Sequence, residues 1–356
     1  MMSDIYKNKK TLVAVLASHD SAEKNNQLST AFEKLYDHNA DQLAKFHFVF
    51  TGGTFRRLIL AENVNDSYGN KLRPISEDVK NHLLEQCGVT VLPDRTQCGV
   101  TILANLIVQR QCSIIWPFLS PNTPHWLTPD YLALMRLCDL WYAKRLMNVA
   151  SVLEWFKYEA PRDEKRNPQI VNPLTLKLGS AEKSVDWPKA DEIHLESGLK
   201  YYQLRLPYGN ERCHGEIYEL GQRTIALVAH DDMKKRIVDY AIQYEDELCN
   251  FSRILATGHT GQEVKNACRN IRENELLRSY LSGPKGGDIE IATEILFNRC
   301  HTVVFFVDPL NPHPHIDDIR VVFIACMAEI EKNDVRMLTN EVHAREWIEG
   351  LRRRRV

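Results

Sequence analysis

Short runs of apolar and β-branched residues alternate along this chain with longer stretches in which apolar residues recur at helical spacing. Residues 12–16, 225–229 and 303–307 are examples of the runs, and residues 232–248 and 289–297 are examples of the amphipathic stretches. Apolar runs that alternate with amphipathic helices are typical of a parallel sheet with helices on both faces. The sequence therefore predicts an α/β fold.

Four sequence landmarks occur twice, in the same order. They are an apolar run that leads to His-Asp, a Thr-Gly loop, an apolar run followed by a loop that ends in Pro-His, and an Asn shortly before Glu-Trp. The paired segments are residues 12–20 and 225–231, 51–54 and 257–260, 113–125 and 302–315, and 148–155 and 340–347. An ordered recurrence of this kind indicates a tandem duplication.

The two repeats define the expected domain organisation. We predict two tandem three-layer α/β/α domains with mostly parallel sheets, at residues 1–157 and 222–356, joined by a linker at residues 158–221. Within the linker, residues 201–206 and 216–220 resemble strands and flank a Pro-Tyr-Gly-Asn turn, which predicts a β-hairpin. This hairpin could belong to either repeat.

Composition and charge narrow the function classes. The 45 Lys and Arg residues and 47 Asp and Glu residues give a net charge of −2, so no overall field favours nucleic acid or an anionic membrane. The nine cysteines form no CxxC pair, which favours reduced thiols over a disulfide framework. The apolar runs are far shorter than the roughly 20 residues of a membrane span, and residues 1–10 lack the apolar core of a signal peptide. We therefore expect a cytoplasmic protein.

The loops that follow the apolar runs of the second repeat carry the candidate chemistry. Because the carboxyl ends of parallel strands meet at one edge of a sheet, we expect these loops to lie together. They contain His230, Asp231 and Lys234, the stretch 257–261 (TGHTG), the stretch 281–288 (LSGPKGGD), Asp308, and His315, Asp317 and Asp318. Glycines in such loops expose backbone N–H groups to an anion, and a helix that begins within residues 257–261 adds its positive end. The sequence predicts a phosphate site beside several carboxylates and two histidines.

Each of these features also has a simpler interpretation. A Thr-Gly-His-Thr-Gly stretch is often a plain turn, Asp288 at a helix start is a typical N-cap, and His315 after a proline fits an ordinary loop residue. His313, His315, Asp317 and Asp318 together suggest a metal site, but their spacing matches no recognised ligand pattern, so no metal is predicted. Their joint occurrence after successive strands favours the functional interpretation.

Residues 223–347, about a third of the chain, resemble methylglyoxal synthases. The matching strings, in order, are IALVAHD with Lys234, ATGHTG, LSGPKGGD, FFVDPL, NPHPHIDD and the pair Thr339 and Asn340. The resemblance implies a lyase that converts dihydroxyacetone phosphate to methylglyoxal and inorganic phosphate, with no metal and no organic cofactor.

The resemblance also implies a role for each matched residue. Asp288 corresponds to the catalytic base of the family and His315 to its catalytic histidine. The other matched aspartates of the active site are Asp231, Asp308 and Asp318, and the substrate or phosphate contacts are His230, Lys234, Thr257, Gly258, Thr260, Ser282 and Gly283. The assignment is chemically reasonable, because a carbon acid beside a carbonyl needs a base, a donor for the developing oxyanion and a cation for the departing phosphate. Several carboxylates in one cleft also push one another's proton affinities apart.

Two positions depart from the family pattern. His259 occupies a place in the phosphate loop where the family usually has a threonine, and Ile324 occupies the place of an arginine that the first repeat retains as Arg136. The family also has an arginine near its C-terminus that can reach the phosphate site of a neighbouring subunit. Residues 352–355 are four arginines that could serve this purpose or could form a solvated tail.

The first repeat lacks several of the implied catalytic groups. The expected replacements are Gly99 for Asp288, Leu119 or Ser120 for Asp308, and Glu23 for Lys234. We therefore expect a catalytically silent first repeat that contributes to stability or subunit assembly, with a retained regulatory ligand site as the alternative.

The expected protein is thus a lyase that acts on a small phosphorylated substrate and releases phosphate. Two alternatives stay open: a non-catalytic regulatory module that binds a phosphorylated metabolite, and a related enzyme with a bulkier phosphorylated substrate, which His259 would suit. Because the family forms hexamers of single domains, the resemblance implies a homo-oligomer of three doubled chains.

Overall fold

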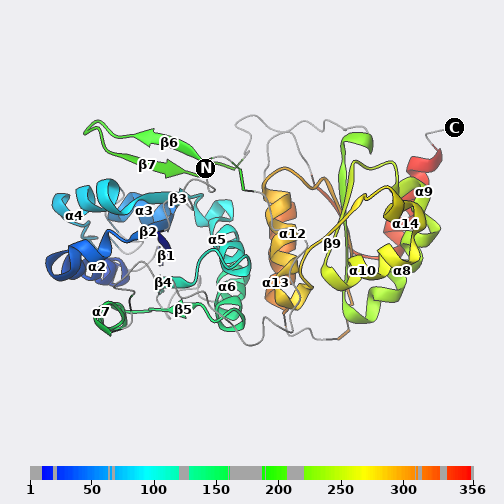
Figure 1. Ribbon diagram of the computed structural model, residues 1–356. Helices are drawn as coiled ribbons and strands as arrows, with labels where there is room; N and C mark the ends of the chain where they lie inside the picture. The colour runs from blue at the N-terminus through cyan, green and yellow to red at the C-terminus, as the bar shows by residue number, and fades with distance from the viewer. Residues whose placement is uncertain are drawn as a thin grey trace. The chain divides into compact units, whose positions relative to one another are not determined.

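The computed structural model forms two compact units, each with its own sheet and core (Figure 1). Described residues up to 205 belong to the first unit and those from 206 onward to the second. The structure describes residues 10–18, 22–62, 65, 69–119, 128–158, 160, 187–188, 190–206, 220–308, 310–311, 315–328 and 335–353.

The first unit contains a sheet in the order β5-β4-β1-β2-β3-β7-β6. Its strands are β1 (Thr11–Ala17), β2 (Phe46–Thr51), β3 (Val89–Leu92), β4 (Ile114–Phe118), β5 (Lys144–Arg145), β6 (Asp191–His194) and β7 (Lys200–Gln203). Its helices are α2 (Ala22–Leu43), α3 (Gly52–Leu58), α4 (Glu77–His82), α5 (Gly99–Val108), α6 (Pro129–Leu140) and α7 (Val149–Tyr158), with a π-helical segment η1 (Leu83–Cys87) and a 3₁₀ turn η2 (Arg95–Gln97). All of its strand pairs are parallel except β6 with β7.

The second unit contains a fully parallel sheet in the order β10-β9-β8-β11-β12. Its strands are β8 (Thr224–Ala229), β9 (Arg253–Ala256), β10 (Leu277–Ser279), β11 (Thr302–Phe306) and β12 (Arg336–Leu338). Its helices are α8 (Lys234–Gln243), α9 (Glu245–Leu248), α10 (Gly258–Ala267), α11 (Arg269–Glu273), α12 (Gly287–Leu296), α13 (Ile316–Met327) and α14 (Glu341–Arg353), with 3₁₀ turns η4 (Leu220–Gln222), η5 (Asp231–Met233) and η6 (Gly283–Lys285).

Strands β1 to β5 and strands β8 to β12 follow the same order across their sheets. When the five strands of each set are numbered in chain order, the order across the sheet is 5-4-1-2-3 in both units. The expected α/β fold with mostly parallel sheets is therefore confirmed, and the two units share one topology.

Helices cover both faces of the second sheet. Helices α12 and α13 pack together on one face, and α8 and α10 pack together on the other, with α14 beside α8 (Figure 1). Ile225 and Leu227 of β8 join the core on the side of α8, where they meet Ile237 and Tyr240. The intervening residue Ala226 is also fully buried, because successive side chains of a strand point to opposite faces. Burial on both faces explains why β8 lacks polar alternation.

The β-hairpin lies earlier in the chain than the sequence pattern predicted. β7 pairs with the preceding strand β6, with Asp191 opposite Gln203, and also lies parallel to β3. Tyr201 is buried against Phe55 at a ring distance of 4.6 Å, so its apolar contacts hold the hairpin in the first unit. Residues 207–219 lie outside the described residues, and residue 220 begins the turn η4. The prediction of strands at 201–206 and 216–220 was therefore wrong in its pairing.

The helices α5 and α12 begin with matching turns. Cys98 and Gly286 both have left-handed backbone conformations, with φ values of 60° and 107°. The N–H of Gly99 donates to the carbonyl of Asp94 at 2.9 Å, and that of Gly287 donates to the carbonyl of Ser282 at 3.1 Å. Gly99 therefore corresponds to Gly287, and Val100 corresponds to Asp288. The expectation that Gly99 replaces Asp288 was one residue out of register.

A second correction concerns the end of the first strand of each unit. The N–H of Ser18 donates to the carbonyl of Phe118, and the N–H of His230 donates to that of Phe306, both at 3.1 Å. Ser18 therefore corresponds to His230. The sequence pattern had instead paired His19 with His230. The following helices begin at residues 22 and 234, so Ala22, and not Glu23, holds the place of Lys234. His19, Asp20, Ser120 and His125 lie outside the described residues.

Across the described ranges, no helix is both long and apolar enough to cross a membrane.

Replacement of Gly287 by alanine is expected to destabilise the second unit by at least about 2 kcal/mol, because the added Cβ would overlap the carbonyl oxygen of Leu281. Gly350 in α14 is the matched control, since a Cβ there meets no atom within 4 Å and alanine favours a helix by about 0.5–1 kcal/mol. Denaturant unfolding of Gly287→Ala and Gly350→Ala beside the wild type measures both effects. Equal stability of the two variants would contradict the packing assigned to this loop.

Candidate active site

The carboxyl end of the second sheet brings the candidate residues onto adjacent loops. His230 follows β8, Thr257 follows β9, residues 280–286 connect β10 to α12, and Asp308 lies two residues beyond β11. These are the loops that the sequence predicted to lie together at one edge of the sheet. Within them the structure brings the side chains together in three groups.

The first group is Asp288 with His315. Asp288 is the second residue of α12, and its side chain is 3% exposed. The Nε2 atom of His315, which precedes α13, lies 3.7 Å from Oδ2 of Asp288. The carboxylate also packs on Gly283, where an added Cβ would lie 2.9 Å from it. A proton acceptor and an imidazole thus lie side by side, largely shielded from water.

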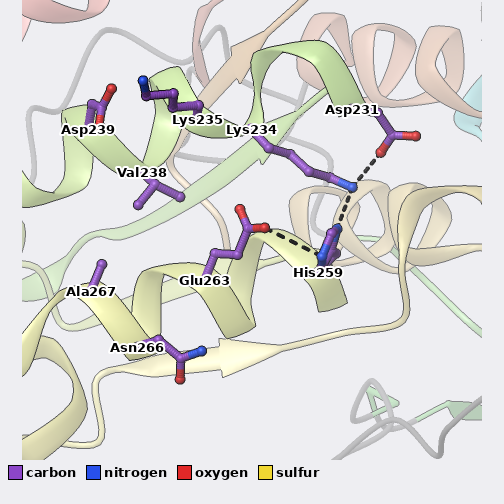
Figure 2. A pocket seen from close by; sticks show the side chains of 9 residues that line it. All are labelled: Asp231, Lys234, Lys235, Val238, Asp239, His259, Glu263, Asn266 and Ala267. Atoms are coloured by element: carbon purple, nitrogen blue, oxygen red, sulfur yellow. Dashed lines mark hydrogen bonds and ion pairs between the residues drawn. The ribbon is translucent and has the colours of Figure 1, made fainter.

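The second group is Asp231, Lys234 and His259 (Figure 2). The ammonium group of Lys234 donates to the carboxylate of Asp231 and lies 2.6 Å from Nδ1 of His259. This hydrogen bond from Lys234 is the main reason that the pKa of Asp231 is lowered. Because the Asp231 side chain is 76% exposed and ionised, it is poorly suited to remove a proton from carbon.

The third group is His230 with Asp308. The backbone N–H of Asp308 donates to Nδ1 of His230 at 2.7 Å, so the neutral ring carries its proton on Nε2. The carboxylate of Asp308 accepts from the N–H of Leu310 at 2.9 Å and from the side chain of Asn311 at 2.6 Å. Asp308 therefore shapes the loop after β11. Asp318 is fully buried in the first turn of α13.

The start of α10 presents backbone N–H groups to the same edge of the sheet. The N–H of Gly258 donates to the carbonyl of Leu281 at 2.9 Å. The next two N–H groups, of His259 and Thr260, precede the first intrahelical bond, which Gly261 donates to Thr257 at 2.7 Å. N–H groups in this position are the usual partners of an anion at a helix terminus. Thr257 and Thr260 are themselves buried.

Two adjoining hollows mark this edge of the unit. One, of about 510 Å³, is lined by residues of all the loops up to α12, including Gly258, Ser282 and Lys285. The other, of about 910 Å³, lies between α8 and α10 (Figure 2). Asp231, Lys234 and His259 line both. Neither Asp288 nor His315 lines either hollow, but the Asp288 carboxylate packs on Gly283, which lies between the lining residues Ser282 and Pro284.

Three residues that the sequence analysis did not single out lie at or beside this site. Glu263 lies one helical turn after His259, with Oε1 3.4 Å from its Nε2 atom, and Lys285 lines the smaller hollow. Glu290 is buried in α12 and accepts the N–H of Leu281 at 2.9 Å. Only Glu263 had a usable signal, its spacing of four residues from His259.

The remaining predictions concern metal binding and the basic tail. Among the described residues, no group of three or more His, Cys, Asp or Glu side chains could hold a metal ion, and His313 lies outside those residues. Arg352 is in the last turn of α14, where it pairs with Glu247 and lies 5.6 Å from the ring centre of Tyr244. Residues 354–356 lie outside the described residues.

The chain is similar to methylglyoxal synthases from Agrobacterium fabrum and Thermoanaerobacterium thermosaccharolyticum, with identities of 38% and 39% over 129 residues. These matches span 36% of this chain, and 94% and 87% of the two relatives. The chain belongs to the methylglyoxal synthase family. A solved methylglyoxal synthase structure from Elizabethkingia anophelis matches 36% of this chain and 78% of its own, with 26% identity and a TM-score of 0.29. No family-level sequence model matches the chain.

Membership of the methylglyoxal synthase family supports an enzyme of that kind, within about a third of the chain. The resemblance drawn from the motifs of the second repeat is thereby confirmed. The roles of individual residues stay predictions.

Replacement of Glu290 by glutamine is expected to stabilise the protein at pH 8 but not at pH 5. Burial raises the pKa of Glu290 to about 8, so the folded protein keeps a proton that the unfolded chain has released. The stability contribution of this proton is complete below about pH 4.5 and is lost as the pH rises towards 8. Glutamine retains an acceptor for Leu281 and cannot ionise, so we expect a gain of about 1–3 kcal/mol at pH 8.

Denaturant unfolding at the two pH values measures this difference. The exposed Glu275→Gln is the control for loss of a carboxyl group at the surface of the same unit. A Glu290→Gln variant with the same relative stability at pH 5 and pH 8 would show that the buried carboxyl titrates normally.

Proposed function

We propose that the second unit is a carbon–oxygen lyase that converts dihydroxyacetone phosphate to methylglyoxal and phosphate. The observation that carries the proposal is the placement of the shielded Asp288 carboxylate 3.7 Å from the His315 imidazole, next to a pocket with Lys234 and the start of α10. Membership of the methylglyoxal synthase family supports it.

The first step is removal of a proton from the hydroxymethyl carbon beside the substrate carbonyl. Asp288 takes this proton, and the electron pair of the C–H bond moves to the carbonyl oxygen to give an enediolate. His315 donates a hydrogen bond to that oxygen, which lowers the energy of the developing charge. Shielding from water favours both interactions, since charges interact more strongly in a low-dielectric site.

The second step is departure of phosphate from the other carbon beside the carbonyl. The hydroxyl group on the deprotonated carbon gives up its proton and becomes the aldehyde carbonyl, the carbon–carbon double bond shifts to the carbon that bears the phosphate, and the C–O bond to phosphate breaks with its electron pair on the phosphate. Lys234 and the N–H groups of His259 and Thr260 stabilise the leaving dianion. The enolate that remains takes up a proton on its methylene carbon and becomes methylglyoxal.

We propose further that the first unit is a silent copy of the second. The shared strand order and the matching turns before α5 and α12 support duplication. Val100, at the place of Asp288, has no basic group. The Asp94 carboxylate, paired with Arg56 at 2.7 Å, lies so close to Gly52 that an added Cβ would be 2.6 Å from it. Asp94 thus puts negative charge at the loop that corresponds to the phosphate loop.

A homo-oligomer of three chains and a cytoplasmic location stay predictions from the sequence. The role of the first unit in such an assembly is stability or subunit contact.

The test is formation of methylglyoxal and phosphate from dihydroxyacetone phosphate by the full-length protein. We expect wild-type activity, a loss of about 10³-fold or more in kcat for Asp288→Asn, and a loss of about 10²-fold for His315→Gln, because general acid–base groups contribute about 10²–10⁴-fold. Both variants should still bind phosphate.

Asp94→Asn is the matched control, a rim carboxylate of the first unit, and should keep the wild-type kcat within about twofold. Phosphate binding by the wild type without any methylglyoxal formation would contradict the proposal and favour a regulatory binding module. Activity on a longer sugar phosphate, and none on dihydroxyacetone phosphate, would favour the bulkier substrate.

A further inference from the structure

The imidazole of His259, at the start of α10, is a hydrogen-bond partner of the ammonium group of Lys234. Nδ1 of His259 lies 2.6 Å from Nζ of Lys234, and Nε2 lies 3.4 Å from Oε1 of Glu263 (Figure 2). Lys234 also donates to Asp231. A continuous row of Asp231, Lys234, His259 and Glu263 thus separates the two hollows, and both of its middle members line each hollow.

This arrangement requires a neutral ring. An ammonium group has no acceptor, so Nδ1 must accept the hydrogen bond, and the ring proton lies on Nε2 towards Glu263. A protonated ring would instead place two cations 2.6 Å apart, which is strongly unfavourable.

A dianion at the start of α10 would change this arrangement. Lys234 would then turn towards the anion, which frees Nδ1 of His259 and removes the nearest positive charge. The two negative charges of the anion and the carboxylate of Glu263 both favour an imidazolium ion. Imidazoles change charge between about pH 5 and pH 8, so this difference falls in an accessible range.

We propose that His259 is a positioning residue for Lys234 that couples binding of a phosphoryl group to uptake of one proton by its ring. The proposal rests on the proposed function only in taking the start of α10 as the phosphoryl site. A threonine at this position can neither hold Lys234 through a ring nitrogen nor change its charge, so His259 sets how phosphoryl affinity depends on pH.

Charged groups from every neighbouring element face the ring or line the same hollows. They are Asp231 on η5, Lys234, Lys235 and Asp239 on α8, Glu263 on α10 and Lys285 on η6. His315 acts on the row through its charge interaction with Asp231. All of these groups are common to the wild type and to any variant of His259. A difference between the two proteins in the pH dependence of anion affinity therefore isolates the effect of the ring.

The experiment measures sulfate affinity of the full-length protein by calorimetry at pH 6 and pH 8. Sulfate keeps two negative charges over this range, which removes the titration of phosphate itself. We expect wild-type sulfate binding to be about tenfold tighter at pH 6 than at pH 8, which corresponds to about one pKa unit of coupling. For His259→Thr we expect a change of less than about threefold, due to the other histidines.

His259→Asn separates positioning from charge. The amide oxygen of the asparagine replaces Nδ1 as an acceptor for Lys234 but cannot take up a proton. At pH 6 and at pH 8, the sulfate affinity of this variant should therefore stay near the value that the wild type has at pH 8. Equal pH dependence in the wild type and His259→Thr would overturn the inference while leaving the lyase proposal intact. Absence of sulfate binding at both pH values would contradict the phosphoryl site and this inference together.

Discussion

The carbonyl group of Leu281 is the point on which the geometry of the second unit depends. It accepts the N–H of Gly258 at 2.9 Å and lies in the space that a side chain at position 287 would need. The N–H of the same residue is held by Glu290. The backbone of one residue, Leu281, therefore joins the loop after β10 to the first turns of α10 and α12. This contact fixes the distance between the N–H groups of α10 and the carboxylate of Asp288, and it leaves room for no residue but glycine at 287.

The first unit has the same backbone contact but a different residue after it. The carbonyl of Pro93 accepts the N–H of Gly52 at 3.3 Å and lies in the space that a side chain at Gly99 would need. The turn into α5 is therefore preserved, while the residue after it is Val100. Backbone packing and reaction chemistry are thus separable: the glycines maintain the fold in both units, and the side chains that follow them decide what each unit can do.

The sequence predicted those features that depend on local pattern. Apolar runs buried on both faces identified the strands, and the loops after them, such as Thr257 after β9 and residues 280–286 after β10, lie at one edge of the sheet. The register between the units was missed by one residue, because Cys98 adopts the left-handed conformation that the pattern associates with glycine. Contacts between distant side chains, such as Lys234 with His259, depend on how α8 packs on α10 and have no local signal.

The proposed reaction depends on removal by Asp288 of a proton from the hydroxymethyl carbon of dihydroxyacetone phosphate. Substrate deuterated at that carbon tests this step, with release of deuterium to water followed by NMR. We expect release by the wild-type protein and a loss of about 10³-fold in its rate for Asp288→Asn. Release of deuterium by Asp288→Asn at the wild-type rate would contradict it.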